Sequence, residues 1–401
     1  MSAARPLPAL AVAAALACGT AVSLGLARFA YALLLPAMRS DLGWSYLTAG
    51  AMNTVNAAGY LAGALAAPWA MERLGVRAAF VAATAATALA LAAHGLVASD
   101  AALYGLRFVS GLVSAPSLVA GAVLAAGLGS SERERRGTVS AGLVLGMYYG
   151  GTGVGIVAAA LLVPSLAQLL ATHAWQPAWL GLGAAGALAT VLAALGTRGA
   201  GDRRSGRATT DGDARFRWRA FAPGLLAYLL FGLGYIGYMT FVVTLLRERD
   251  LAPGLVTAFY AMLGLAVVAS SWIWAGMLQR FRGGESLAIL NALLAVATVL
   301  PLVSATPLAV FASGLLFGAV FLSLVTSTTA LIRHNLAPPL WPSAISAFTV
   351  LFALGQIVGP ALVGFVADRF GGLAAGLACS AAVLALGALA AMRQKALPIS
   401  R

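Results

Sequence analysis

The sequence predicts an all-α membrane protein with twelve transmembrane helices in two pseudo-symmetric six-helix bundles. Only 9% of its 401 residues are charged, 61% are hydrophobic, and the mean hydropathy is +0.92. A soluble protein usually has about a quarter of its residues charged, so lipid must be the main solvent of this chain. Apolar stretches of about 20 residues, the length that crosses a bilayer, recur along nearly the whole sequence.

The first apolar stretch follows Arg5 and resembles the start of a secretory signal. A signal has an apolar region of only about 7–15 residues, whereas this stretch continues to Pro36, so we interpret it as a membrane helix. The twelve predicted spans cover 9–37, 45–71, 78–98, 101–128, 138–163, 177–196, 220–246, 254–278, 286–304, 308–332, 343–367 and 371–392.

The longest polar stretch divides the chain nearly in half. It runs from Thr197 to Arg219 and is too charged and too poor in apolar residues to pack a core. We therefore predict an N-terminal bundle over 1–197, a cytoplasmic linker over 198–219 and a C-terminal bundle over 220–401.

A weak internal repeat relates the two halves. Shifting the chain by 207 residues superposes several glycine, arginine and tyrosine positions, as expected for a membrane protein built from two like-oriented halves. After the fourth helix pair the offset becomes 213. The matched pairs are Gly25 with Gly232, Arg28 with Tyr235, Tyr31 with Tyr238, Arg73 with Arg280, Gly111 with Gly318, and then Gly142, Gly146 and Gly151 with Gly355, Gly359 and Gly364.

The formal net charge of +13 does not indicate a nucleic-acid partner. Most of the 25 basic residues fall in loops that lie on one side of the membrane if the N-terminus is cytoplasmic, which is the positive-inside pattern. We expect a multi-pass protein of the bacterial inner membrane with both termini in the cytoplasm. The two cysteines lie in the first and last spans without a CxxC partner, and no metal or cofactor is predicted.

Three segments resemble motifs of the major facilitator superfamily (MFS) of secondary transporters. Residues 72–77 (ERLGVR) resemble its cytoplasmic loop, with Glu72 where an Asp is usual. Residues 103–115 (LYGLRFVSGLVSA) match its motif around an arginine embedded in helix 4. Residues 142–151 (GLVLGMYYGG) resemble its antiporter motif, although Met147 replaces the proline, which weakens the antiporter inference.

Two further segments are similar to the YbfB/YjiJ branch of the superfamily. They are residues 25–38 (GLARFAYALLLPAM) and residues 56–65 (NAAGYLAGAL). The resemblance implies the MFS fold and secondary transport by rocking of the two bundles, and it implies that loop 72–77 latches the halves. Glu72, Arg73 and Arg77 are therefore expected to be gating residues.

Arg28 and Arg107 are the two charged residues placed well inside predicted spans, because all twelve acidic residues map to loops or helix ends. A charge inside a bilayer is costly and usually faces a cavity with a function. Guanidinium groups bind carboxylates through paired hydrogen bonds, so a substrate anion is the expected partner. For Arg107 an alternative is that it only holds backbone carbonyls of the first helix. Tyr31 is also expected to be a substrate-binding residue.

A polar stripe on helix 2 and tyrosines on helix 7 complete the predicted substrate site. Asn53, Asn56 and Tyr60 share one helix face, as do Tyr235 and Tyr238. Each set has an alternative as interhelical hydrogen bonding or packing.

No HExxH, GxSxG or phosphate-loop sequence is present, so the chain is not expected to be an enzyme. The leading hypothesis is a monomeric secondary transporter of a small organic anion, with membrane lipid as its other partner. The alternatives are a proton-coupled drug or metabolite exporter and, outside transport, a polytopic sensor or scaffold.

Overall fold

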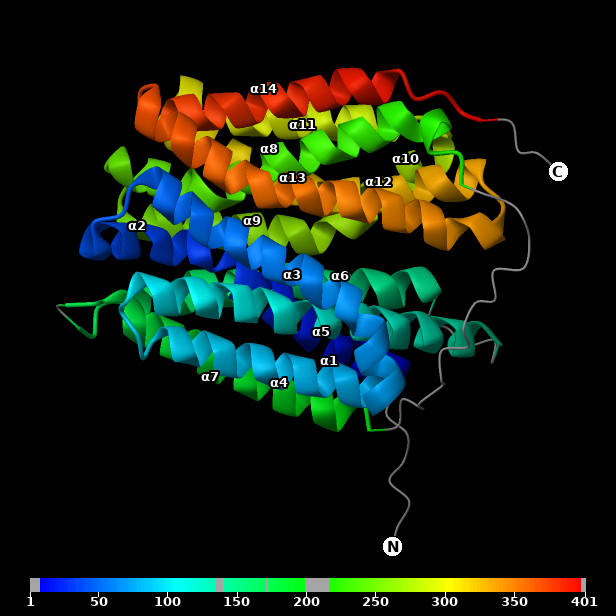
Figure 1. The fold of residues 1–401 in the computed structure, drawn as a ribbon, viewed down its shortest axis with the longest axis horizontal. Coiled ribbons are helices and arrows are strands. Elements are labelled where there is room, and N and C mark those ends of the chain that lie inside the picture. The colour runs from blue at the N-terminus through cyan, green and yellow to red at the C-terminus, as the bar shows by residue number, and fades with distance from the viewer. Residues whose placement is uncertain (1–7, 135–139, 171, 199–215, 398–401) are drawn as a thin grey trace, which may run out of the picture. The chain divides into compact units, whose positions relative to one another are not determined.

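The computed structural model describes residues 8–134, 140–170, 172–198 and 216–397. Within those ranges every regular element is a helix (Figure 1). The first half of the chain forms α1 (Ala9–Thr20), η1 (Ala21–Phe29), α2 (Tyr31–Leu42), α3 (Tyr46–Leu74), α4 (Val76–His94), α5 (Asp100–Glu134), α6 (Ala141–Leu166) and α7 (Trp175–Gly196).

The second half begins with a short 3-10 turn and continues with long helices. Its elements are η2 (Trp218–Phe221), α8 (Ala222–Glu248), α9 (Pro253–Ile273), α10 (Ala275–Arg280), α11 (Glu285–Val303), α12 (Pro307–Asn335), η3 (Pro338–Leu340), α13 (Trp341–Arg369) and α14 (Leu373–Met392).

The predicted spans correspond to these helices in order. Differences are confined to the ends and to local breaks: the first helix continues to Leu42, α4 ends at His94, and α9 is separated from α10 at Trp274. Residues 138 and 139 of the fifth predicted span lie outside the described residues.

Eleven helical segments in the described ranges are long and apolar enough to cross a membrane. The twelfth long helix, α3, has 29 residues but is not among these eleven, and it carries two asparagines in its first half. Its predicted place at 45–71 nevertheless coincides with a helix.

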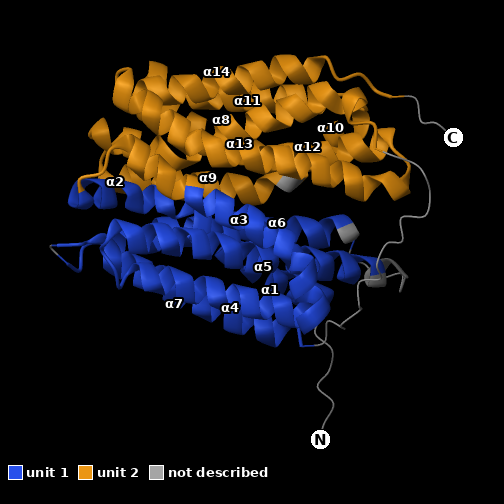
Figure 2. Cartoon of the chain, in the orientation of Figure 1, with its two compact units in different colours: residues 1–42, 55–206 blue, residues 43–54, 207–401 orange. Residues whose placement is uncertain are grey.

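The chain divides into two compact units, which are coloured separately in Figure 2. Unit 1 comprises residues 1–42 and 55–206, and unit 2 comprises residues 43–54 and 207–401. The helix α3 therefore contributes its first turns to unit 2 and its remainder to unit 1. Most of the predicted linker, residues 199–215, lies outside the described residues, so its assignment stays a prediction.

Unit 1 has a core between α1, α4, α5 and α6. Phe80 of α4 and Tyr148 of α6 are fully buried at its centre. The Tyr148 hydroxyl donates a 2.6 Å hydrogen bond to the Leu118 carbonyl of α5. In lipid, such interhelical bonds and close packing hold helices together, because apolar burial alone gives little driving force there.

In unit 2, α8 packs against α13 and α14, and α12 packs against α9 and α11. The first turns of α3 belong to this unit and lie along α13. The Asp368 carboxylate at the end of α13 accepts hydrogen bonds from the backbone N–H groups of Tyr46 (3.0 Å) and Leu47 (2.8 Å). It thereby satisfies donors that the start of α3 would otherwise leave without intrahelical partners.

Candidate functional site

Arg28 lies in an unusual stretch of helix in unit 1. Nine residues, Ala21–Phe29, form a π-helix between α1 and α2, and the Ala30 N–H bonds to the Gly25 carbonyl at 3.0 Å. Such wide turns are rare and are frequent at functional sites. The Arg28 side chain is only 4% exposed, and its guanidinium carbon is 5.2 Å from the ring centroid of Tyr60 on α3.

The π-helix packs closely on α6 at a pair of glycines. A Cβ atom added at Gly25 would lie 2.6 Å from the Cα atom of Gly155, which is closer than real Cβ contacts. Backbone therefore meets backbone at this point. This contact holds the π-helix against α6 one turn before Arg28.

Arg107 on α5 reaches the same turn. Its guanidinium donates a 3.0 Å hydrogen bond to the Ala27 carbonyl, and it lies 4.5 Å from the ring centroid of Tyr31. Arg107 is 1% exposed. The bond to Ala27 is the backbone role that the sequence left open for Arg107, and a substrate contact for it stays a prediction.

Asn56 connects α3 to α5 beside these arginines. Its amide nitrogen donates to the Arg107 carbonyl and to the Ser110 hydroxyl, each at 3.0 Å. A buried amide with two partners aligns the helices that carry Tyr60 and Arg107. Within unit 1 the structure thus brings together Arg28, Tyr31, Asn56, Tyr60 and Arg107.

Asn53 lies one turn earlier on α3 and belongs to unit 2. Its amide donates to the Thr240 hydroxyl of α8 at 2.7 Å, and that hydroxyl donates to the Ile236 carbonyl at 2.6 Å. Asn53 is buried. These bonds fit the interhelical alternative for Asn53.

Tyr235 lies in an aromatic stack within unit 2. Its ring centroid is 4.7 Å from Phe231, 5.7 Å from Phe352 and 5.9 Å from Phe321, with nearly parallel planes for the last two. Its hydroxyl accepts a 2.5 Å hydrogen bond from the Gln356 amide. Offset stacks of this kind add stability beyond the area they bury.

Tyr238 is also buried in unit 2. It stacks on Phe317 at 4.0 Å between ring centroids, and its hydroxyl is 2.6 Å from the Ser313 hydroxyl. These contacts fit the packing alternative, and substrate contact for Tyr235 and Tyr238 stays a prediction.

Comparison with known proteins identifies the family. The family model described as "Uncharacterised MFS-type transporter YbfB" matches residues 20–392, most of the chain. The chain belongs to this family of MFS transporters. The predicted fold class and the resemblance to the YbfB branch are confirmed, and the family is one of transporters rather than enzymes. No curated protein matches the sequence significantly.

Solved structures show the same fold. A bacterial homologue of the human lysosomal transporter Spinster, in an inward-facing and unoccupied conformation, is 15% identical with a TM-score of 0.70, and the match covers 96% of each chain. A variant of the nucleoside transporter NupG is also 15% identical, with a TM-score of 0.72 and coverage of 95% of this chain and 99% of that chain. The family match shows that the protein is a multi-pass membrane transporter, and a transporter family implies a small-molecule substrate.

The predicted gating residues of this transporter lie around the turn between α3 and α4. Arg77 donates to the Thr197 carbonyl at 2.9 Å and to the Ala194 carbonyl at 2.8 Å, so it caps the end of α7. The Arg73 guanidinium is 4.9 Å from the Trp69 ring centroid, and Glu72 is exposed. Their part in gating stays a prediction.

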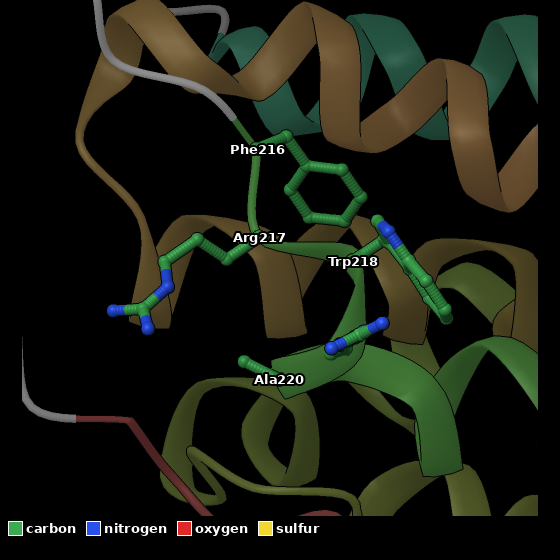
Figure 3. Close-up of a pocket in the computed structure, with 5 residues that line it drawn as sticks. Phe216, Arg217, Trp218 and Ala220 are labelled. Carbon is green, nitrogen blue, oxygen red and sulfur yellow. The ribbon is translucent and has the colours of Figure 1, made fainter.

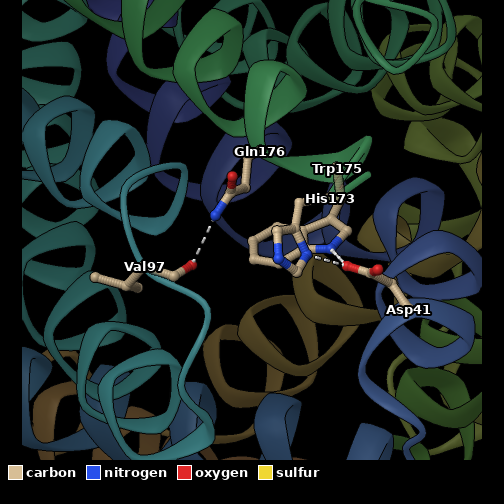
Figure 4. A network of polar contacts seen from close by, with 5 residues as sticks. All are labelled: Asp41, Val97, His173, Trp175 and Gln176. Atoms are coloured by element: carbon tan, nitrogen blue, oxygen red, sulfur yellow. Dashed lines mark hydrogen bonds and ion pairs between the residues drawn. The ribbon is translucent and has the colours of Figure 1, made fainter. Parts of the chain in front are cut away.

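A network of polar contacts joins the end of α2 to the start of α7 in unit 1 (Figure 4). Asp41 is in the last turn of a 34-residue helical run, much longer than the roughly 20 residues that cross a bilayer, so we place it outside the apolar layer. Its carboxylate accepts hydrogen bonds from His173 (2.5 Å) and Trp175 (2.6 Å). The bond from His173 is the main cause that lowers the pKa of Asp41 below its usual value, and the bond from Trp175 contributes less.

Several partners of the predicted residues were not anticipated. Gln356 and Thr240 are polar side chains inside apolar helices, and that isolation is a signal from which they could have been found. Ser110 lies within the motif around Arg107 and could have been paired with Asn56. The Ala27 carbonyl and the π-helix have no side-chain signal in the sequence.

Proposed function

We propose that this transporter moves a small organic anion by alternating access, with Arg28 as the substrate anchor. The observation that carries the proposal is the pair of buried arginines on adjacent elements of unit 1. Arg28 is 4% exposed and Arg107 is 1% exposed, the helices that carry them are in contact, and burial in a membrane raises the cost of each charge. An arriving anion would offset that cost.

The placement of acidic residues supports an anionic substrate. Among the described residues, every Asp and Glu lies in a terminal helical turn or outside the helices. Negative charge at the depth of Arg28 would therefore come with the substrate. A carboxylate suits a guanidinium edge because it can accept two parallel hydrogen bonds.

The tyrosines beside the arginines have a supporting part in this proposal. Tyr31 and Tyr60 each face a guanidinium and would orient it, because a cation over an aromatic ring is attracted to the ring face. Arg107 and Asn56 would hold the turn that carries Arg28. Asn53, Tyr235 and Tyr238 are proposed as further substrate contacts, and Glu72, Arg73 and Arg77 as gating residues.

The proposed orientation of the protein in the membrane rests on the distribution of its basic residues. We infer a bacterial inner-membrane location with both termini cytoplasmic, because the basic loops gather on one side. A monomer suffices for the proposed mechanism, since one chain contains both halves of the repeat.

The proposal is tested by ligand binding and flux in the purified protein. A bound ligand raises the melting temperature, so the protein is screened with mono- and dicarboxylates, aromatic acids, nucleosides, sugars and cationic drugs. An organic acid should stabilise the protein and cross proteoliposome membranes. Stabilisation by cationic compounds alone would favour the exporter alternative, and absence of any flux would favour a sensor or scaffold.

Arg28→Ala should weaken binding of that acid about 100-fold, because a bidentate charged contact is lost. Arg28→Lys should restore binding only in part, since an ammonium group lacks the planar fork. Arg369→Ala is the matched control, because Arg369 is an exposed arginine at a helix end. Full binding and flux in Arg28→Ala would contradict the anchor role.

A further inference from the structure

The segment before α8 forms an open pocket in unit 2. Phe216, Arg217, Trp218, Arg219 and Ala220 line a pocket of about 550 Å³. Figure 3 shows the Phe216 and Trp218 rings on one side of the segment and the Arg217 side chain extending to the other. The Trp218 side chain is 58% exposed.

Other chain segments meet this pocket at the same end of unit 2. The Gln394 amide donates to the Ala220 carbonyl at 3.2 Å, and the Gly284 N–H donates to the Gln394 carbonyl at 2.8 Å. The Asn335 amide in turn donates to the Arg282 carbonyl at 2.7 Å. The start of α8, the start of α11, the end of α12 and the segment after α14 are thus neighbours.

This end carries a strong excess of exposed positive charge. Of the acidic residues described in unit 2, only Glu285 lies here, because Glu248, Asp250 and Asp368 are at the opposite ends of their helices or just beyond. Three arginines lie against aromatic rings, among them Arg219 at 5.5 Å from Trp218 and Arg333 at 5.2 Å from Trp341. The exposed basic residues, which we call the basic collar, are Arg217, Arg219, Arg280, Arg282, Arg333, Arg393 and Lys395.

The basic collar lies around the ends of the apolar segments that include α8, α11, α12 and α14. The apolar segment that includes α8 begins at Trp218 itself. Tryptophan is enriched at membrane interfaces, and long basic side chains there keep their apolar stems in contact with lipid and their charged groups in water. A ligand at this pocket would therefore meet the Arg217 guanidinium on one side, and on the other side the aromatic rings with the Arg219 guanidinium beside Trp218.

We propose that the pocket at Phe216–Ala220, within the basic collar, binds the headgroup of an anionic phospholipid. The phosphate oxygens would accept hydrogen bonds from Arg217 and Arg219, and the acyl chains would pass the Trp218 and Phe216 rings into the apolar layer. Charge complementarity with the seven basic residues of the collar favours an anionic lipid over a zwitterionic one. This site is independent of the substrate anchor at Arg28.

The test measures lipid binding to the purified full chain in a neutral detergent. Dioctanoyl phosphatidylglycerol is titrated, with dioctanoyl phosphatidylcholine and inorganic phosphate as separate arms, and binding is followed by native mass spectrometry and by melting temperature. The double variant Arg217→Gln with Arg219→Gln should bind phosphatidylglycerol roughly 30-fold more weakly, about fivefold for each arginine.

The matched control removes two exposed arginines from the other end of the same unit. Arg247→Gln with Arg369→Gln has the same change in net charge, and it should bind phosphatidylglycerol within about twofold of the unchanged protein. Equal weakening in both double variants would overturn the proposal, because the binding would then be a general charge effect. Equal binding of phosphatidylcholine would overturn it as well, as would saturation by phosphate at the lipid's concentration.

Discussion

Arg28 and Tyr235 occupy equivalent positions of the internal repeat, 207 residues apart, yet their surroundings differ in kind. In unit 1, Arg28 sits in a π-helix with its guanidinium over the Tyr60 ring. In unit 2, Tyr235 sits in the regular helix α8, inside a stack of phenylalanine rings. One half of the repeat therefore presents buried positive charge, and the other presents aromatic surface.

A backbone contact between two other helices of each unit is the same in both halves. A Cβ atom added at Gly111 of α5 would collide with the carbonyl oxygen of Asn56, and one added at Gly318 of α12 would collide with the carbonyl oxygen of Leu263. The two contacts are equivalent in the repeat, because Gly318 lies 207 positions after Gly111 and Leu263 lies 207 positions after Asn56. At this contact the repeat keeps its backbone packing while the side chains differ, with Asn56 in one half and Leu263 in the other.

Alanine at the two glycines should produce the largest effect. Gly111→Ala and Gly318→Ala should each destabilise the protein by about 3 kcal/mol, because a backbone carbonyl cannot move aside as a flexible side chain can. Thermal unfolding in detergent measures the change. Gly105→Ala is the control on α5, since an added Cβ there meets nothing within 4 Å. If Gly111→Ala lowered the thermal stability and Gly318→Ala left it unchanged, the two contacts would not be equivalent.

Tyr235→Phe should have a smaller effect and should separate packing from substrate binding in unit 2. The variant keeps the ring stack and removes the hydroxyl that accepts the Gln356 amide, so the cost should be about 1 kcal/mol of stability. If Tyr235 only packs, affinity for the acid found in the screen should change less than about threefold. Gln356→Leu is the companion variant, because it removes the same bond from the other side. Lost affinity in Tyr235→Phe with affinity retained in Gln356→Leu would assign the hydroxyl to the substrate.

The positions of the helices, the internal repeat and the placement of acidic residues at helix ends could be predicted from the sequence, because each depends on local composition or on spacing. Apolar length predicts a span wherever it occurs, and α3 was placed correctly even though Asn53 and Asn56 make it less apolar. Every acidic residue that the structure describes lies at a helix end or outside the helices, as predicted.

Partners and backbone register could not be predicted in the same way. The π-helix that contains Gly25 packs on Gly155, which is 130 positions away in the chain, and neither the π-helix nor this contact has a local signal in the sequence. The face shared by Asn53 and Asn56 was predicted from spacing, but Asn53 bonds within unit 2 and Asn56 within unit 1. Spacing along one helix places a side chain on a face, and only the neighbouring helices decide its partner.

Asp41 and Glu248 extend the comparison to the ends of the equivalent helices, again at an offset of 207. Glu248 accepts a 2.6 Å hydrogen bond from the Tyr46 hydroxyl, whereas Asp41 accepts bonds from His173 and Trp175. The pKa of Asp41 is lower in the folded protein than its ordinary value of 3.8, first because of the bond from His173. A lowered pKa stabilises the fold fully above the unfolded value, and that stabilisation is lost as the pH falls through the folded value.

Acidification from pH 5 to pH 3 should therefore lower the melting temperature of the unchanged protein more than that of Asp41→Asn or His173→Ala. The difference should stay below about 1 kcal/mol, because Asp41 is 28% exposed and His173 is 43% exposed, and water screens such pairs. Gln176→Ala is the control, because it removes an uncharged bond to the Val97 carbonyl from the same network (Figure 4). The difference in melting temperature between this variant and the unchanged protein should therefore be the same at every pH. Parallel melting curves for Asp41→Asn and the unchanged protein across this range would show that the His173 bond does not couple the folding of unit 1 to protonation.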